Sequence, residues 1–196
     1  MTAAPPRFVT GSLMRHVVVM AGTGAIGLIA IFAVDLINLL YISMLGEQAI
    51  AAAVGFAGVV GFFMLSLFIG LLIGVTATVS RTIGAGRMAD ARALATSSLV
   101  LVAAIAALVS GLTLVFLEPL LHLLGARDRV AELAQRFLTI ALPSTVMLGV
   151  GMVCSALLRS VGDARRAMLV TLLPAIVTAI LDPLFIFGFK LGLDGA

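Results

Sequence analysis

Charged residues divide this chain into long uncharged stretches. Between Glu47 and Arg81 lie 33 consecutive residues without Asp, Glu, Lys or Arg, and 25 lie between Arg92 and Glu118. A further 22 separate Arg136 from Arg159. An α-helix needs about 20 apolar residues, each adding about 1.5 Å, to cross the hydrocarbon core of a bilayer. Stretches of this length predict membrane-spanning helices.

Two further apolar stretches each contain a single acid. Asp35 interrupts residues 16–46, and Asp182 interrupts residues 167–189. The five predicted spans are residues 16–43, 49–78, 92–117, 132–158 and 166–189. Such runs lack the alternation of lipid-facing and lumen-facing residues that a membrane barrel requires. We therefore predict an all-α fold, a polytopic membrane helix bundle. Because the connections are short, consecutive helices are expected to pack as antiparallel neighbours.

The composition excludes most classes of soluble protein. Hydrophobic residues make up 62% of the chain and charged residues 11%, whereas soluble domains average about 45–50% and about 25%. Soluble enzymes and nucleic-acid binders do not fit these values, so no nucleic-acid partner is expected. The single cysteine, Cys154, excludes a disulfide-stapled secreted domain. The predicted spans contain no HExxH, GxSxG or paired histidine motif, so we expect no enzymatic activity, no cofactor and no catalytic residue.

The distribution of basic residues predicts the orientation in the membrane. One side of the predicted bundle carries eight arginines and two acids, Asp90 and Asp163, for a net charge of +6. The other side carries four basic and five acidic residues, for a net charge of −1. The arginines of the basic side are Arg7, Arg15, Arg81, Arg87, Arg92, Arg159, Arg165 and Arg166. Lys and Arg are in excess in cytoplasmic loops. We therefore predict a multi-pass protein of the inner (plasma) membrane with a cytoplasmic N-terminus.

The chain divides into three predicted segments. Residues 1–15 form a cytoplasmic N-terminal leader, residues 16–190 hold the transmembrane helices, and residues 191–196 form an extracytoplasmic loop. Residues 117–125 are predicted to form a short amphipathic helix at the outer interface. Small residues allow helices to approach closely, and the second span has five glycines on one face: Gly55, Gly58, Gly61, Gly70 and Gly74. Because five is an odd number of spans and the chain stops on a loop, we expect a sixth helix to be missing.

Asp35 and Asp182 are the candidate functional residues. A carboxylate at bilayer depth costs about 2.5–3.5 kcal/mol even on the lenient insertion scale, and such residues mark ion or proton pathways. Asn38 lies one helical turn after Asp35, and Thr178 lies one turn before Asp182. Pro183 cannot donate a hydrogen bond to the carbonyl of residue 179, which allows the helix to bend there. We expect the two acids to share one cavity, where either binds a proton or Na⁺; no other metal site is expected.

Four segments resemble the multidrug and toxic compound extrusion (MATE) transporters, of the DinF-like branch. They lie in the order and at the spacings of that family, and together they extend over nearly the whole chain. The segments are VDLINLLYISMLGEQAIAAAVG (34–55), SRTIGAGRMADARALA (80–95), ALLRSVGDARRAM (156–168) and LDPLFIFGFKLGLDGA (181–196). The LRSVGD turn followed by LDPLFIFG is the most specific part of the resemblance.

The resemblance implies twelve transmembrane helices in two six-helix lobes, of which this chain supplies helices one to five of the N-terminal lobe. Family acids in helices one and five carry the coupling ion. Asp182 matches the helix-five acid. The commonest acidic position of helix one falls on Asn38, and Asp35 lies one turn earlier, where many relatives also have an acid. Thr178 stands where many members have asparagine.

The resemblance therefore implies a secondary active antiporter that exports organic cations and drugs in exchange for H⁺ or Na⁺. Protonation of Asp182, assisted by Asp35, would release the substrate as the helix moves near Pro183. The expected partners are small organic cations, the lipid bilayer, the missing helix six and a C-terminal lobe. One alternative is a flippase for lipid-linked oligosaccharides, disfavoured because it needs cavity arginines and the arginines here are expected in loops. The other is a non-transporting membrane fragment.

Overall fold

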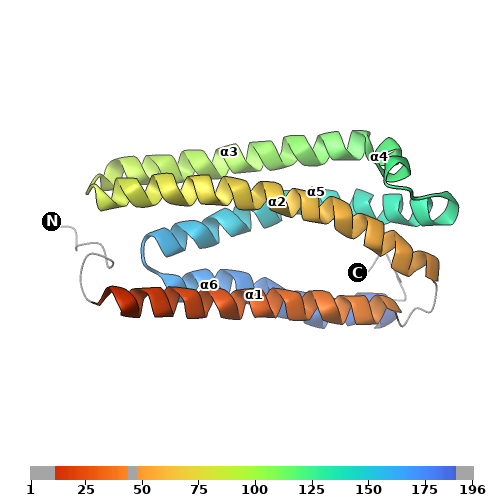
Figure 1. The fold of residues 1–196 in the computed structure, drawn as a ribbon, viewed down its shortest axis with the longest axis horizontal. Helices are drawn as coiled ribbons and strands as arrows, with labels where there is room; N and C mark the ends of the chain where they lie inside the picture. Colours follow the sequence, from red (N-terminus) through yellow and green to blue (C-terminus); the bar gives the residue numbers. More distant parts are fainter. Residues whose placement is uncertain (1–11, 44–47, 189–196) are drawn as a thin grey trace.

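A computed structural model of the chain describes residues 12–43 and 48–188 (Figure 1). Its long helices are α1 (Leu13–Ser43), α2 (Gln48–Gly84), α3 (Met88–Val115), α5 (Asp128–Ser160) and α6 (Ala164–Pro183). The short helix α4 (Leu117–Leu123) follows α3, and a π-helical turn, η1 (Leu184–Gly188), follows α6. Within the described residues, five helices are long and apolar enough to cross a membrane. The predicted all-α bundle with five spans is therefore confirmed.

All five long helices begin before their predicted spans, and α2 and α5 also end after them, whereas α3 and α6 end earlier than predicted. Several charged residues therefore belong to helix ends. Helix α2 ends at Gly84 rather than residue 78, and α5 runs from Asp128 to Ser160. Arg159, expected in a loop, thus lies in the last turn of α5. The predicted loop 191–196 and residues 1–11 of the predicted leader lie outside the described part of the chain.

Glycines make the tight turns between helices. Gly86, Gly125 and Gly162 have φ angles of 75°, 98° and 86°. Residues with a side chain rarely adopt this left-handed conformation, and glycine does so readily just after a helix. After the last of these turns, the backbone N–H of Arg166 donates a hydrogen bond of 3.1 Å to the Asp163 carboxylate, which caps α6. The α5–α6 turn is therefore fixed at both sides.

The helices pack in two groups. Helices α2, α3, α4 and α5 share the main apolar core, in which Met64, Phe68 and Leu142 are almost fully buried. In the same group, the Ser110 hydroxyl of α3 donates a buried hydrogen bond of 2.7 Å to the carbonyl of Leu142 on α5, directly before Pro143. Helix α1 packs along α6 and barely touches α2 (Figure 1).

The expectation that consecutive helices are neighbours is therefore wrong for α1. It holds for α2 with α3 and for α5 with α6. Successive long helices alternate in direction, so α1 and α6 run the same way (Figure 1). Helix α1 thus packs against the parallel helix α6 instead of the expected antiparallel neighbour α2.

Close helix approach occurs at other glycines than those predicted. At none of Gly55, Gly58, Gly61, Gly70 and Gly74 would an added Cβ meet an atom within 4 Å. At Gly149 on α5, by contrast, a Cβ would lie 3.1–3.3 Å from three ring carbons of Phe68 on α2. A single glycine in the core, Gly149, therefore allows α5 to lie close to α2. The glycine-rich face of α2 makes no close helix contact within the described chain.

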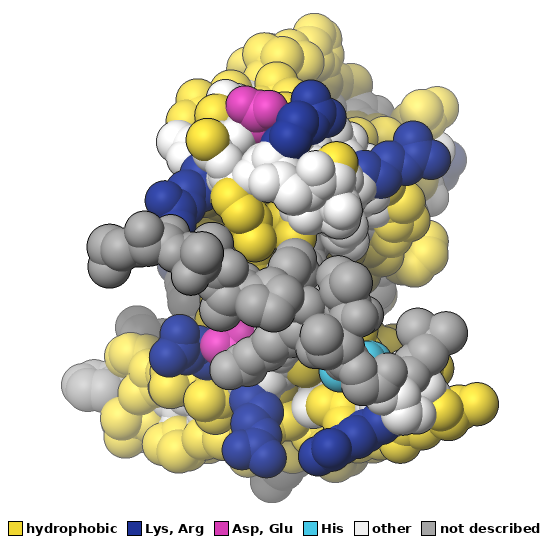
Figure 2. All heavy atoms as spheres, turned by 90° about the vertical axis from the view of Figure 1, so that its left-hand side faces the viewer, with side chains coloured by type: hydrophobic (Ala, Val, Ile, Leu, Met, Phe, Trp, Pro, Cys, Tyr) yellow, Lys and Arg dark blue, Asp and Glu magenta, His cyan; other side chains and the backbone are white. Residues whose placement is uncertain are grey.

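The two ends of the bundle differ in charge. We call the basic end the one formed by the start of α1, the α2–α3 turn and the α5–α6 turn. Figure 2 looks onto this end and shows Lys and Arg side chains spread across it. Figure 1 shows that the α5–α6 turn is recessed relative to the start of α1 and to the α2–α3 turn. The basic end is thus uneven, with the α5–α6 turn set back from the rim.

We predict that Gly149→Ala destabilises the bundle by about 1–3 kcal/mol, because the new methyl group overpacks against the buried Phe68 ring. The matched control is Gly151→Ala on the same helix, where a Cβ meets nothing within 4 Å. Thermal unfolding of the purified protein in detergent measures the difference. Equal midpoints for the two variants would contradict the packing described here.

Candidate ion-coupling site

The parallel helices α1 and α6 approach closely at Gly27 and Thr171. A Cβ on Gly27 would lie 3.0 Å from the Thr171 hydroxyl oxygen and 3.8 Å from its Cβ. The Thr171 hydroxyl is held by a hydrogen bond of 2.9 Å to the carbonyl of Met168. Because Gly27 has no side chain, the α1 backbone can lie against this position of α6. The contact fixes the register between the two helices.

This register brings Asn38 to Asp182. Asn38 lies eleven residues after Gly27, and Asp182 lies eleven residues after Thr171. Eleven residues make about three helical turns. Asn38 therefore lies on the same face of α1 as Gly27, and Asp182 lies on the same face of α6 as Thr171. The Asn38 side chain lies within reach of a hydrogen bond to the Asp182 carboxyl group. When the carboxylate is ionised, only the Asn38 amide can donate this bond.

Two oxygens at this contact are buried without a partner. Asp182 is 8% exposed, and Asn38 is half-buried. Neither the Asn38 Oδ1 nor the Asp182 Oδ2 has a hydrogen-bond partner within the described residues. A buried polar group left unsatisfied costs about 1–3 kcal/mol, and such groups call for a water, an ion or a functional role. The pair therefore has the chemistry of a site for a proton or a small cation.

Asp35 lies differently from Asp182. It is on α1, one turn before Asn38, and its side chain is exposed on this chain. Asp35 makes no hydrogen bond or ion pair to another residue that the structure describes. The structure thus brings Asn38, rather than Asp35, into contact with the buried acid of α6. The sequence held one indication of this role for Asn38: it occupies the position at which the MATE proteins most commonly have an acid in helix one.

The other two predicted residues flank Asp182 along α6. Thr178 lies one turn earlier and is half-buried. Pro183 is the last residue of α6, and the π-helical turn η1 follows it directly. Proline removes a backbone hydrogen bond, and π-helical turns are frequent at functional sites. The backbone after Asp182 therefore departs from regular α-helix, and the bend at Pro183 stays a prediction.

Other polar clusters do not offer a comparable site. A pocket of about 340 Å³ between α4 and α5 is lined by exposed side chains that include Glu118, His122 and Glu132. No group of three His, Cys, Asp or Glu residues in the described ranges is arranged to hold a metal ion. The Asn38–Asp182 pair remains the candidate site.

Comparison with known proteins gives the family. The MatE family model matches residues 24–184, which include Asn38 and Asp182. The chain belongs to the MatE family. This is a family of transporters rather than enzymes, and the resemblance seen in the sequence is confirmed.

Named relatives of this MatE chain include several transporters. It is 35% identical over 178 residues to the FAD transporter of Shewanella oneidensis, with 87% of this chain and 38% of the relative covered. It is 30% identical over 142 residues to the probable multidrug resistance protein NorM of Thermotoga maritima, with 70% of this chain and 30% of the relative covered. The chain thus spans well under half the length of these curated relatives.

Solved structures share the fold of this MatE chain. An outward-facing multidrug resistance MATE transporter of the MOP superfamily superposes with a TM-score of 0.92 at 27% identity, over 100% of this chain and 43% of that one. A MOP superfamily transporter from Pyrococcus furiosus superposes with a TM-score of 0.91 at 27% identity, with the same coverage of both chains. The helix arrangement, including the parallel α1–α6 pair, is therefore that of part of a MATE transporter.

We predict that cysteines at positions 27 and 171 form a disulfide. The Cβ–Cβ distance of 3.8 Å between these positions matches the mean of about 3.8 Å in disulfides. The test uses Gly27→Cys with Thr171→Cys in a Cys154→Ser background, since Cys154 is the only native cysteine. Oxidation should block labelling by a maleimide in membranes.

The control pairs Gly22→Cys with Thr171→Cys, because a Cβ on Gly22 meets nothing within 4 Å. Cross-linking of the control but not of the 27–171 pair would mean that the α1–α6 register differs from the one described.

Proposed function

We propose that this chain is part of a secondary active antiporter that exports small organic cations and drugs in exchange for H⁺ or Na⁺. The family supports transport of small molecules across a membrane. The observation that carries the coupling is the pair of unpartnered buried oxygens at Asn38 and Asp182. The proposal concerns a whole transporter longer than this chain, since the relatives are more than twice its length.

A proton or Na⁺ would satisfy both unpartnered oxygens. Protonation turns the Asp182 Oδ2 from an acceptor into a donor, and the Asn38 Oδ1 is an acceptor that lacks a donor. Na⁺ would take both oxygens as ligands, as hard cations prefer oxygen. Either event removes the net negative charge of the pair. The loss of that charge weakens the attraction for a cationic substrate, so ion entry and substrate release are coupled.

The backbone beside Asp182 provides a means of movement. Pro174 and Pro183 both lie inside α6, and each removes one hydrogen bond of the helix. The π-helical turn η1 begins directly after Pro183. A change of charge at Asp182 acts on the least regular part of the helix. We infer that α6 bends there when the ion binds.

Orientation follows from charge. We propose that the basic end faces the cytoplasm and that the chain resides in the inner membrane, since Lys and Arg accumulate on the cytoplasmic side. Among the described residues, Arg15, Arg81, Arg87, Arg92, Arg165 and Arg166 all lie on helix ends or turns of that end.

A second candidate function is the export of flavin dinucleotides. The relative named an FAD transporter is 35% identical over 87% of this chain, compared with 30% over 70% for the relative named a multidrug resistance protein. FAD carries a pyrophosphate, so such a transporter must handle negative charge. Release of FAD into the medium by cells that express the gene, measured by flavin fluorescence, distinguishes this function from the export of cationic dyes.

The two earlier alternatives have different consequences in cells. An oligosaccharide flippase should leave ethidium accumulation unchanged and alter cell-envelope assays. A non-transporting fragment should change neither. Expression of the gene in an efflux-deficient strain, with ethidium accumulation as the readout, separates these three outcomes.

We predict that Asp182→Asn abolishes ethidium efflux while leaving membrane insertion intact, because the amide neither binds a proton at working pH nor changes charge. The matched control is Asp90→Asn, which removes an exposed acid whose ion pair with Arg87 spans 3.7 Å at the surface. Exposed pairs of this kind contribute about 0–1 kcal/mol. Efflux at the wild-type rate in Asp182→Asn would remove the coupling proposal.

We also predict that Asn38→Leu impairs efflux more than Asp35→Asn, because Asn38 contacts Asp182 and Asp35 is exposed. Efflux rates driven in turn by a pH gradient and by a Na⁺ gradient provide the comparison and also identify the coupling ion. If Asp35→Asn reduced the efflux rate more than Asn38→Leu under both gradients, Asp35 rather than Asn38 would be the α1 residue that acts in ion coupling.

A further inference from the structure

Arg159 holds an unusual position at the basic end. It lies in the last turn of α5, it is half-buried, and its side chain reaches across to α1. Its Nη1 lies 3.1 Å from the place that a Cβ on Gly24 would occupy. Gly24 is eleven residues into α1, about 16 Å from the start of that helix. The guanidinium therefore lies between α5 and α1, near the α5–α6 turn, which is set back from the start of α1 (Figure 1).

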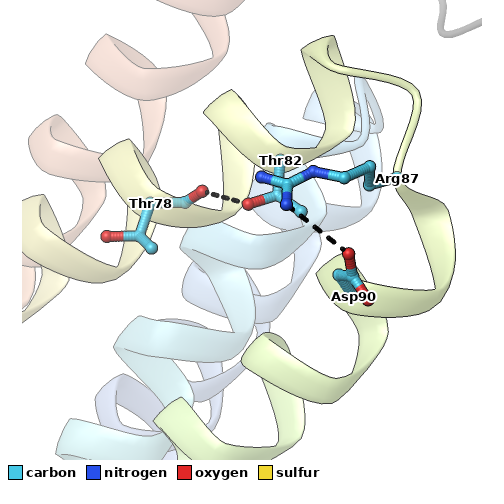
Figure 3. Close-up of polar contacts among 4 residues, drawn as sticks. All are labelled: Thr78, Thr82, Arg87 and Asp90. Carbon is cyan, nitrogen blue, oxygen red and sulfur yellow. Dashed lines mark hydrogen bonds and ion pairs between the residues drawn. The ribbon is translucent and has the colours of Figure 1, made fainter.

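The acids at this end are already paired with other arginines. Asp90 pairs with Arg87 across the start of α3, at 3.7 Å (Figure 3). Asp163 pairs with Arg166, with 3.3 Å between the Oδ2 and the Nε, and it also caps α6. Within residues 12–43 and 48–188, no carboxylate pairs with Arg159.

The positive charge around the α5–α6 turn is thus in excess. Arg165, at the second residue of α6, is exposed and also makes no ion pair within the described part of the chain. Figure 2 shows dark blue side chains around the middle of this end and few magenta ones. An anion approaching this turn meets a net positive field.

We propose that Arg159 binds a phosphate group of an anionic ligand beside the α5–α6 turn. A half-buried guanidinium without a counter-charge is costly to maintain. Its planar fork of N–H donors matches phosphate oxygens in a bidentate manner. The absence of a side chain at Gly24 leaves the room that the guanidinium occupies. The phosphate comes either from a soluble phosphate ester or from the headgroup of an anionic lipid.

A purely structural role for Arg159 is the competing explanation. A cation in the last turn of a helix interacts favourably with the helix dipole and the free carbonyls. Such a role affects stability and does not require a bound anion. The two explanations therefore differ in ligand affinity. The proposal does not depend on coupling at Asp182, because binding is measured at equilibrium without an ion gradient.

The experiment uses the full protein in lipid nanodiscs. In phosphatidylcholine nanodiscs, FAD is titrated by its flavin fluorescence, with inorganic pyrophosphate as competitor. In a second arm, thermal unfolding is compared between phosphatidylcholine nanodiscs and nanodiscs that also contain phosphatidylglycerol. The variants are Arg159→Gln, Arg159→Lys and Gly24→Ala, and the matched control is Arg87→Gln, which removes one arginine from the same end.

Arg159→Gln should weaken pyrophosphate-sensitive FAD binding about tenfold, as expected for the loss of a charge-assisted hydrogen bond. Arg159→Lys should lose less FAD affinity, because lysine keeps the positive charge but lacks the planar set of N–H donors of the guanidinium. If the ligand is a lipid, FAD does not bind, and the stabilisation by phosphatidylglycerol disappears in Arg159→Gln but persists in Arg87→Gln.

Gly24→Ala keeps the arginine and displaces its guanidinium, so it tests the site even if Arg159→Gln does not fold. It should weaken whichever of the two responses the wild type shows. If Arg159→Lys and Gly24→Ala, together with any folded Arg159→Gln, match the wild type in both arms, the phosphate site does not exist and Arg159 serves only the end of α5.

Discussion

The close contact of α1 with α6 at Gly27 and Thr171 determines where the polar side chains of the bundle meet. A shift of α6 by a single residue along α1 would rotate Asp182 by about 100° away from Asn38. The contact depends on the absence of a side chain at Gly27 and on the Thr171 hydroxyl, which its own helix holds in place by a hydrogen bond. The ion-coupling chemistry proposed for this chain thus depends on a helix packing contact about three turns away.

The polar pair is held between an ordered region and an irregular one. Toward the basic end, α6 is capped by Asp163 and contacts α1 closely. Toward the other end, it contains Pro183 and passes into a π-helical turn. A buried acid at such a boundary can change its surroundings by a local bend, and the rest of the bundle, with its separate core around Phe68, need not move.

The sequence predicts the elements well and their pairing poorly. Charge-free stretches identify all five long helices, because the bilayer sets one length for every span. The sequence also identifies Asp182 as a residue of the bundle interior, because a single acid in an apolar membrane span has few other stable places. The partner of α1 could not be predicted, since local spacing contains no information on contacts between the first and last helices. For the same reason, the choice between Asp35 and Asn38 required the α1–α6 register.

Two further differences have simple causes. The glycine spacing on α2 predicts close helix packing there, yet the tight contact lies at Gly149 of α5. Gly149 is needed because the large side chain of Phe68 faces it. Arg159 was expected in a loop because the apolar run ends at residue 158. The helix continues past the end of the apolar run, since helices project beyond the hydrocarbon core and their ends are set by turns such as the one at Gly162.

The pairing of α1 with α6 also has a consequence for biosynthesis. Among the described long helices, α1 is synthesised first, whereas its partner α6 is synthesised last. During translation, α1 therefore stays in the lipid with Asn38 lacking its partner Asp182, while α2, α3 and α5 assemble. A chain released before α6 is complete would therefore leave the Asn38 amide facing the bilayer without a partner from α6.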